Sequence, residues 1–141
     1  MGFTDAVEQA ILDGLFAGWE GYESLWVGLS STTPSGSGGN VTEPSGGSYA
    51  RVETDADDWG AASNTAPASK ANTATITFPT ATADWAGGSN LTHFVLYDAQ
   101  TNGNVVAYGA LTTPKPVLNG DTASFASGQL VLQLGQPADF D

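Results

Sequence analysis

SLWVGLSS, residues 24–31, decides the fold class of this chain. Leu25, Val27 and Leu29 stand two positions apart, which places them on one face of an extended strand. Similar strand-like runs follow along the chain: ATITF (74–78), LTHFVLYDA (91–99), NVVAYGAL (104–111), TASFA (122–126) and QLVLQL (129–134).

Turn signals separate these runs. TNGN (101–104) and NGD (119–121) contain Asn-Gly, which tolerates the positive φ that tight hairpin turns require. Short strands at this spacing, divided by glycine-rich turns, predict a mainly β fold, an antiparallel β-sandwich (jelly-roll or immunoglobulin-like) of seven to eight strands.

One short α-helix is predicted at residues 5–17. Asp5 and Glu8 have the spacing of a capping box, which marks a helix start. Apolar side chains recur at helical spacing up to Gly18, and they are Val7, Ala10, Ile11 and Leu15.

The chain is predicted to form a single domain, residues 1–141. A chain of this length removes roughly 70% of its unfolded surface from water, which is enough for one hydrophobic core. STTPSGSGGNVTEPSGGS (31–48) is rich in glycine and serine and is interpreted as a flexible surface loop within that domain.

The charge balance is strongly acidic. Fifteen Asp and Glu residues stand against Arg51, Lys70 and Lys115, giving a formal net charge of −12. Because phosphate binding needs clustered Lys and Arg, neither nucleic acid nor an anionic membrane surface is an expected partner. A surface of this kind stays hydrated and screened in concentrated salt, so a halophilic source is expected.

The sequence predicts neither thiol chemistry nor a sorting signal. The sequence has no cysteine, which excludes disulfides and zinc-thiolate sites. The opening MGFTDAVEQ lacks a basic segment followed by an apolar run, and no stretch approaches 18 apolar residues. Neither a secretory signal peptide nor a membrane span is expected.

EPSGGSYAR (43–51) resembles a functional loop but does not fit one. A phosphate loop needs Gly-Lys-Ser/Thr before a helix, and a serine elbow needs Gly-x-Ser-x-Gly; Ser48 instead precedes strand-like residues. We interpret the stretch as the entrance to a strand. Arg51, a rare cation, is predicted to form an ion pair with a carboxylate, within the fold or across a subunit boundary.

No metal site or cofactor is predicted. Asp55, Asp57 and Asp58 in DADDW are weak candidates for holding calcium or another salt ion, but the glycine and distal Glu of an EF-hand loop are missing. His93 has no second His or Cys to complete a metal site, and a structural role is favoured over catalysis.

Contact surfaces are predicted from bulky apolar residues. Trp59 and Trp85 each follow an acidic residue and precede small ones, as exposed loop anchors do. With Leu12, Phe16 and Trp19 they are candidates for contacts between subunits or with a capsid, and tryptophans that stack on sugars are the alternative.

The order of segments is more specific than any single motif. AVEQAILDGLF, LWVGLSSTTP, TEPSGGSYARV, ATITFPTATADW, LTHFVLYDA, GNVVAYGALTTPKPVLNGDTASF and LVLQL follow one another from about residue 5 to 134. Together they resemble a family of small structural proteins, often labelled tail fibre proteins, encoded by tailed viruses of bacteria and archaea. The acidic composition adds the expectation of a haloarchaeal virus.

The resemblance implies a non-enzymatic virion protein, made in the host cytoplasm and exposed on the particle. The preferred expectation is a capsid decoration or turret protein that forms a symmetric homo-trimer or homo-pentamer on the major capsid protein. The alternative is a tail fibre or baseplate component, with host surface glycans as a further partner. The resemblance carries no catalytic residues.

Overall fold

The computed structural model describes residues 4–16, 21–64 and 68–134. These residues are mainly β, which confirms the predicted fold class: eight strands in antiparallel sheets and one short α-helix. The elements are α1 (Asp5–Asp13), β1 (Leu25–Ser30), β2 (Val52–Thr54), η1 (Ala56–Asp58), β3 (Ser69–Ala71), β4 (Ile76–Thr77), η2 (Trp85–Gly88), β5 (Leu91–Tyr97), β6 (Val105–Lys115), β7 (Ser124–Phe125) and β8 (Val131–Gln133).

The chain divides into two compact units, each made of separated segments. The first comprises Met1–Ser24, Asp55–Thr75 and Phe125–Asp141, and the second comprises Leu25–Thr54 and Ile76–Ser124. That the 141 residues form a single domain stays a prediction.

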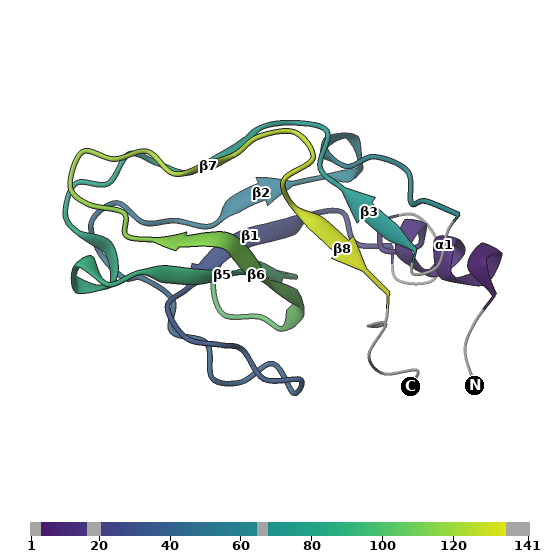
Figure 1. Ribbon diagram of the computed structural model, residues 1–141, viewed down its shortest axis with the longest axis horizontal. Helices are drawn as coiled ribbons and strands as arrows, with labels where there is room; N and C mark the ends of the chain where they lie inside the picture. The colour runs from purple at the N-terminus through teal and green to yellow at the C-terminus, as the bar shows by residue number, and fades with distance from the viewer. Residues whose placement is uncertain (1–3, 17–20, 65–67, 135–141) are drawn as a thin grey trace. The chain divides into compact units, whose positions relative to one another are not determined.

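The second unit is built on a four-stranded antiparallel sheet in the order β2-β1-β5-β6 (Figure 1). β1 lies opposite β5 in a register that pairs Val27 with Leu96 and Leu29 with Phe94. Five of the six β1 residues are buried, and so are the last four of β5. The alternation of residues 24–31 therefore describes a central strand whose apolar face enters the core.

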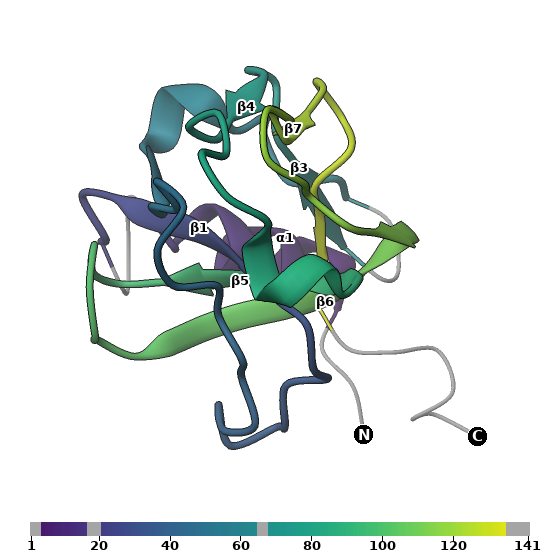
Figure 2. The same ribbon diagram turned by 90° about the vertical axis from the view of Figure 1, so that its left-hand side faces the viewer.

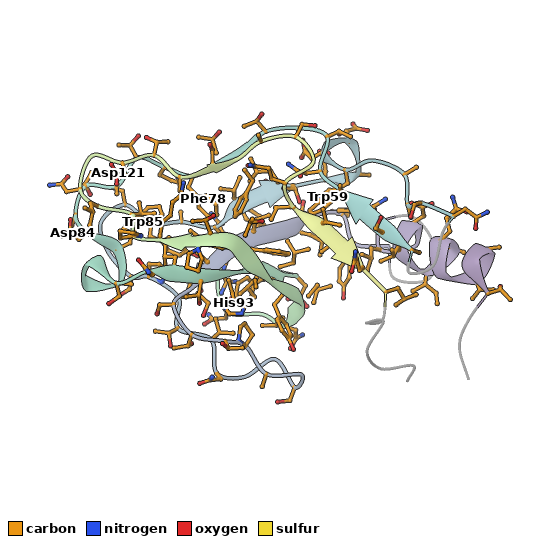
Figure 3. The ribbon with its side chains drawn as sticks, in the orientation of Figure 1. Trp59, Phe78, Asp84, Trp85, His93 and Asp121 are labelled. Carbon is orange, nitrogen blue, oxygen red and sulfur yellow. The ribbon has the colours of Figure 1, made fainter. Side chains whose placement is uncertain are left out.

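A second layer of this unit lies on one side of the sheet, around β4 (Figure 2). Its backbone is joined to residues 117–123 by hydrogen bonds from Phe78, Ala81 and Trp85 N–H groups to carbonyl oxygens at 2.8–2.9 Å. Phe78 and Trp85 are 2% and 0% exposed (Figure 3). The unit thus has a sandwich-like arrangement with an aromatic core.

The β5–β6 hairpin turns at TNGN, as the sequence predicts. Asn102 has φ 55° and Gly103 has φ 72°, the pair of positive values that a type I′ turn requires. A side chain on Gly103 would also collide with Asp98, so glycine is needed here twice over.

The first unit holds α1 and the antiparallel pair β3–β8. α1 ends at Asp13, earlier than the predicted residue 17, because Gly14 follows and residues 14–16 form a turn. The N-cap is Thr4 with no side-chain cap hydrogen bond, so the helix does not start with the predicted capping box. Residue 17 lies outside the described residues.

Candidate functional site

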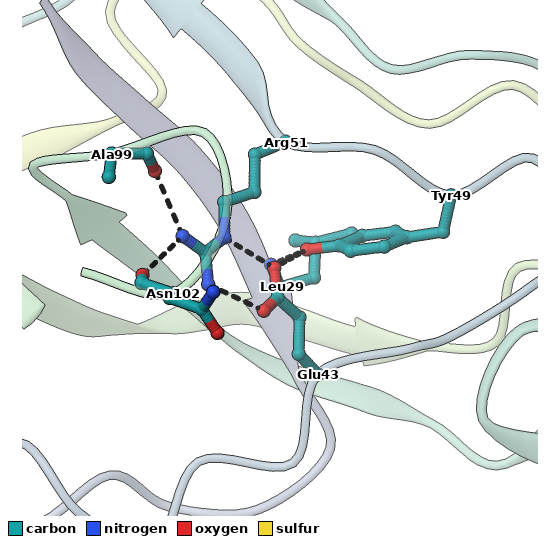
Figure 4. Close-up of polar contacts among 6 residues, drawn as sticks. All are labelled: Leu29, Glu43, Tyr49, Arg51, Ala99 and Asn102. Carbon is teal, nitrogen blue, oxygen red and sulfur yellow. Dashed lines mark hydrogen bonds and ion pairs between the residues drawn. The ribbon is translucent and has the colours of Figure 1, made fainter. Parts of the chain in front are cut away.

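A polar cluster of the second unit surrounds Arg51 (Figure 4). Its Nε and Nη2 donate hydrogen bonds to the two carboxylate oxygens of Glu43, each at 2.9 Å. Its Nη1 donates to the carbonyl oxygens of Ala99 and Asn102, also at 2.9 Å. The Arg51 side chain is only 8% exposed, and the fork geometry of the guanidinium fits this set of acceptors. The ion pair that the sequence predicts for Arg51 thus lies within the second unit, with Glu43 as its partner.

Tyr97 completes the surroundings of the guanidinium. The Arg51 Cζ lies 3.3 Å from the centre of the Tyr97 ring, which is a close cation–π contact. Gly28 makes room for this arrangement, because a Cβ there would lie 2.9 Å from Glu43 Oε2 and 3.0 Å from Tyr97 Cε2. The glycine in LWVGL is therefore required by close approach of neighbouring side chains.

Tyr49 joins this cluster to the aromatic core. Its hydroxyl donates to Glu43 Oε2 at 2.6 Å and accepts from the Leu29 backbone N–H at 3.0 Å. Its ring meets Trp85 edge-on, with centroids 5.1 Å apart, and stacks near Phe78 at 6.3 Å. Burial and the Glu43 carboxylate raise the pKa of Tyr49 well above its ordinary range, so the hydroxyl remains a donor.

The loop at 31–48 contains no helix or strand, as predicted, and its backbone is tied by polar groups. The buried Ser30 hydroxyl accepts from the Thr42 N–H at 3.1 Å, and the Ser31 N–H donates to the Thr42 carbonyl at 3.0 Å. The Thr32 hydroxyl donates to the Asn40 carbonyl at 2.6 Å. These bonds bring the end of the loop, with Glu43, beside β1.

A pocket of about 340 Å³ opens beside the cluster. Exposed Gln100, Thr101 and Asn102 of the β5–β6 hairpin line one part of it. The remaining lining residues are Glu43, Pro44, Tyr49, Ala50 and Arg51. Since Arg51 and Glu43 neutralise each other, the pocket offers hydrogen-bonding groups without a strong net charge.

The predicted tryptophan anchors are wrong for both residues that the structure describes. Trp85 is fully buried, and its indole N–H donates to the Gly47 carbonyl at 2.9 Å. Trp59 is 5% exposed and its ring lies 6.5 Å from that of Phe16. Burying a large aromatic ring removes much apolar area from water, and this favours a place in the core over a place in an exposed loop. Both tryptophans are therefore core residues.

The other predicted contact residues give a mixed picture. Leu12 is 6% exposed and belongs to the core, whereas Phe16 is half-buried. Trp19 lies outside the described residues. Among the candidates the structure describes, only Phe16 keeps a partly accessible apolar surface.

Two carboxylates of the acidic turn 55–58 accept hydrogen bonds from backbone N–H groups of the same turn. Asp55 accepts a hydrogen bond from the Asp57 N–H, and Asp58 accepts from the Asp55 N–H, each at 2.9 Å. This is a capping box of η1. Within residues 4–16, 21–64 and 68–134, no group of three or more His, Cys, Asp or Glu residues is placed to hold a metal ion.

His93 lies on β5 beside Thr92, whose hydroxyl is 2.8 Å from His93 Nδ1. Its cross-strand neighbours are Ser30 and Ala110. This environment fits the structural role that the sequence favours for His93.

Sequence reasoning missed the partners that complete the cluster, Glu43, Tyr49 and Tyr97. Glu43 and Tyr49 stand eight and two residues before Arg51 in the quoted stretch EPSGGSYAR, so a local signal was present. Tyr97 and the carbonyls of the 99–102 turn are more than 45 residues away and become neighbours only through strand pairing.

Comparison with known proteins adds one finding. A family model described as podophage GP4 fiber I protein gp80 matches residues 2–133, which is nearly the whole chain. The comparison with curated proteins finds no match.

Replacing Arg51 tests the cluster. We expect Arg51→Ala to lower the free energy of unfolding by about 3 kcal/mol, because a largely buried carboxylate and two carbonyls lose their donor. Arg51→Lys keeps the charge without the fork and should recover only part of this loss.

Urea denaturation of both variants measures these losses. Glu43→Gln and the double variant Arg51→Ala/Glu43→Gln complete a double-mutant cycle with Arg51→Ala. The double variant should cost less than the sum of the single ones, because neither charge is then left unpaired. Additive losses would contradict coupling between Arg51 and Glu43.

Asp98 predicts how stability depends on pH. Hydrogen bonds from the backbone N–H and then the side chain of Asn104 hold the pKa of Asp98 below its ordinary value of 3.8. The folded state therefore binds this proton less tightly than the unfolded chain does. The stabilisation is present above about pH 4 and is lost as the pH falls through the lower folded pKa.

Thermal unfolding between neutral and acidic pH measures this effect. Asp98→Asn should reduce the fall in melting temperature as the pH is lowered. Asn104→Ala should reduce this fall only in part, because the backbone donor remains. If the melting temperature of Asp98→Asn falls at acidic pH as much as that of the unmodified chain, Asp98 does not contribute to the pH dependence of stability.

Proposed function

Because the chain belongs to the family of the podophage GP4 fiber I protein gp80, we propose that it is a non-enzymatic fibre protein of a phage virion. The match over residues 2–133 is the observation that carries this proposal. The β-rich fold, with its aromatic core and hydrogen-bonded loops, is compatible with a structural role. The fibre description of this family favours the tail-fibre alternative over the capsid-decoration interpretation.

The distribution of charge supports a protein or neutral partner. The side chains of Arg51 and Lys70 are 8% and 7% exposed, and each is paired with a carboxylate. Of the three cations, only Lys115 lies on the exposed surface. Because Arg51 and Lys70 are each paired with a carboxylate, the net charge of −12 is unchanged and Lys115 is the one exposed cation, which disfavours contact with nucleic acid. In the described part of the chain, no helix has the length and apolarity to cross a membrane.

Several finer expectations stay predictions. They are the capsid-decoration or turret location, the homo-trimer or homo-pentamer, contact with the major capsid protein, and a haloarchaeal, halophilic virus.

Locating the chain on the particle tests the proposal. Antibody labelling of intact virions, read by electron microscopy, should mark the tail. Labelling of the head would instead support decoration of the capsid, and virions that carry no label after the antibody is shown to bind the folded chain would overturn both interpretations.

Host-glycan binding is a second candidate function, moved from the tryptophans to the pocket. Trp59 and Trp85 are too buried to stack on a sugar. The side chains of Gln100, Thr101 and Asn102, by contrast, are exposed and line a pocket of about 340 Å³. Amide and hydroxyl groups around a neutralised charge pair suit a neutral saccharide unit.

Saturation-transfer NMR with methyl glycosides of neutral hexoses tests this candidate. Transfer to at least one glycoside is expected for the unmodified chain and should be lost in Gln100→Ala/Thr101→Ala. Ser45→Ala, an exposed loop change outside the pocket lining, is the matched control. Transfer that survives the double variant would exclude this pocket.

A further inference from the structure

The β6 edge of the four-stranded sheet is open. β6 is the last strand in the order β2-β1-β5-β6, and within the described residues it pairs with β5 alone. It is eleven residues long, yet none of its residues is buried. One row of its backbone N–H and C=O groups is therefore available to another strand.

The central part of β6 lacks charge and proline, two of the features that usually protect an edge. Its pairing with β5 is regular over residues 107–110 and shifts register on either side of them. Residues 105–113, VVAYGALTT, contain no charge and no proline. Pro114 and Lys115 protect only the end of the strand. The opposite edge, β2, is three residues long and carries Glu53. Long uncharged edges of this kind are templates for strand addition.

Charge limits which surfaces of two copies can meet. Each copy carries a net charge of −12, so most surfaces repel one another. β6 contains no acidic residue and ends in Lys115.

We propose that two copies of this chain pair β6 against β6, antiparallel, around a two-fold axis at Gly109. Gly109 is the midpoint of the uncharged stretch 105–113. In this register Tyr108 of one copy lies opposite Ala110 of the other, within the stretch 107–110 that pairs regularly with β5. The contact thus brings together stretches that carry no charge, where two copies of an acidic chain do not repel each other.

The contact closes on itself. An interface that uses the same strand in both copies forms a dimer and leaves no second β6 edge to extend it. The short β2 edge limits further growth of the sheet. The pairing is independent of the place of the protein on the virion.

A charge-swap experiment with the full chain tests both the dimer and its register. In Tyr108→Glu/Ala110→Glu, Glu faces Glu at both symmetry-related positions, so dissociation should become about tenfold easier. In Tyr108→Lys/Ala110→Glu, Lys faces Glu at the same positions, and dimerisation should return. Tyr108 is 40% exposed and Ala110 is exposed, so neither change enters the core.

Light scattering coupled to size exclusion gives the mass, in about 0.15 M NaCl, which screens repulsion between distant charges of the two copies but not between side chains in contact. The unmodified chain should have twice its 14.4 kDa. Ser45→Glu/Ala83→Glu adds two carboxylates at exposed positions outside β6 and should remain dimeric.

Hydrogen exchange supplies a second readout. Backbone amides at alternate positions of β6 should be protected in the dimer and exchange faster in the Glu/Glu variant. A monomer or trimer of the unmodified chain, a Glu/Glu variant as dimeric as the control, or failure of the Lys/Glu variant to recover would each overturn the proposal.

Discussion

The hydroxyl of Tyr49 holds the second unit together at one point. β2 pairs with β1 only as far as Val27, so the β1 backbone beyond that residue needs other partners. The Tyr49 hydroxyl accepts a hydrogen bond from the Leu29 N–H and donates one to Glu43. Its ring packs on Trp85 and Phe78. One side chain therefore satisfies the sheet edge, anchors the loop and joins the apolar core.

The rest of the cluster follows from placing Glu43 at that hydroxyl. A carboxylate with little exposure needs further donors, and Arg51 supplies a fork of two. The remaining Arg51 donors then fix the 99–102 turn, so the loop after β1 and the β5–β6 hairpin are joined through one guanidinium. Lys70 is used similarly in the first unit, where it donates to Asp13 and to the Gly60 carbonyl. Two of the three cations of this acidic chain thus have side chains of low solvent exposure and form ion pairs that join separate segments.

The two edges of the main sheet are treated differently. The β1–β2 side is completed by the loop, Tyr49 and Thr42, whereas β6 is eleven residues long and carries no charge before Lys115. In a protein of a virion fibre family, a strand edge that is left open is a natural place for assembly, because backbone hydrogen bonds need no particular partner side chains.

The sequence by itself predicted most of the strands, the TNGN turn and the acidic charge balance, and it excluded a phosphate loop or a serine elbow in EPSGGSYAR, since periodicity, glycine and charge act locally. β3, Ser69–Ala71, lies outside every predicted strand-like run. Only the tertiary structure decided that Arg51 meets Glu43 and the 99–102 turn, and that Trp59 and Trp85 are core residues. The reason is distance along the chain. Trp85 is satisfied by the Gly47 carbonyl, 38 residues away, and such a pairing depends on strand register and layer packing, which no local pattern of residues encodes.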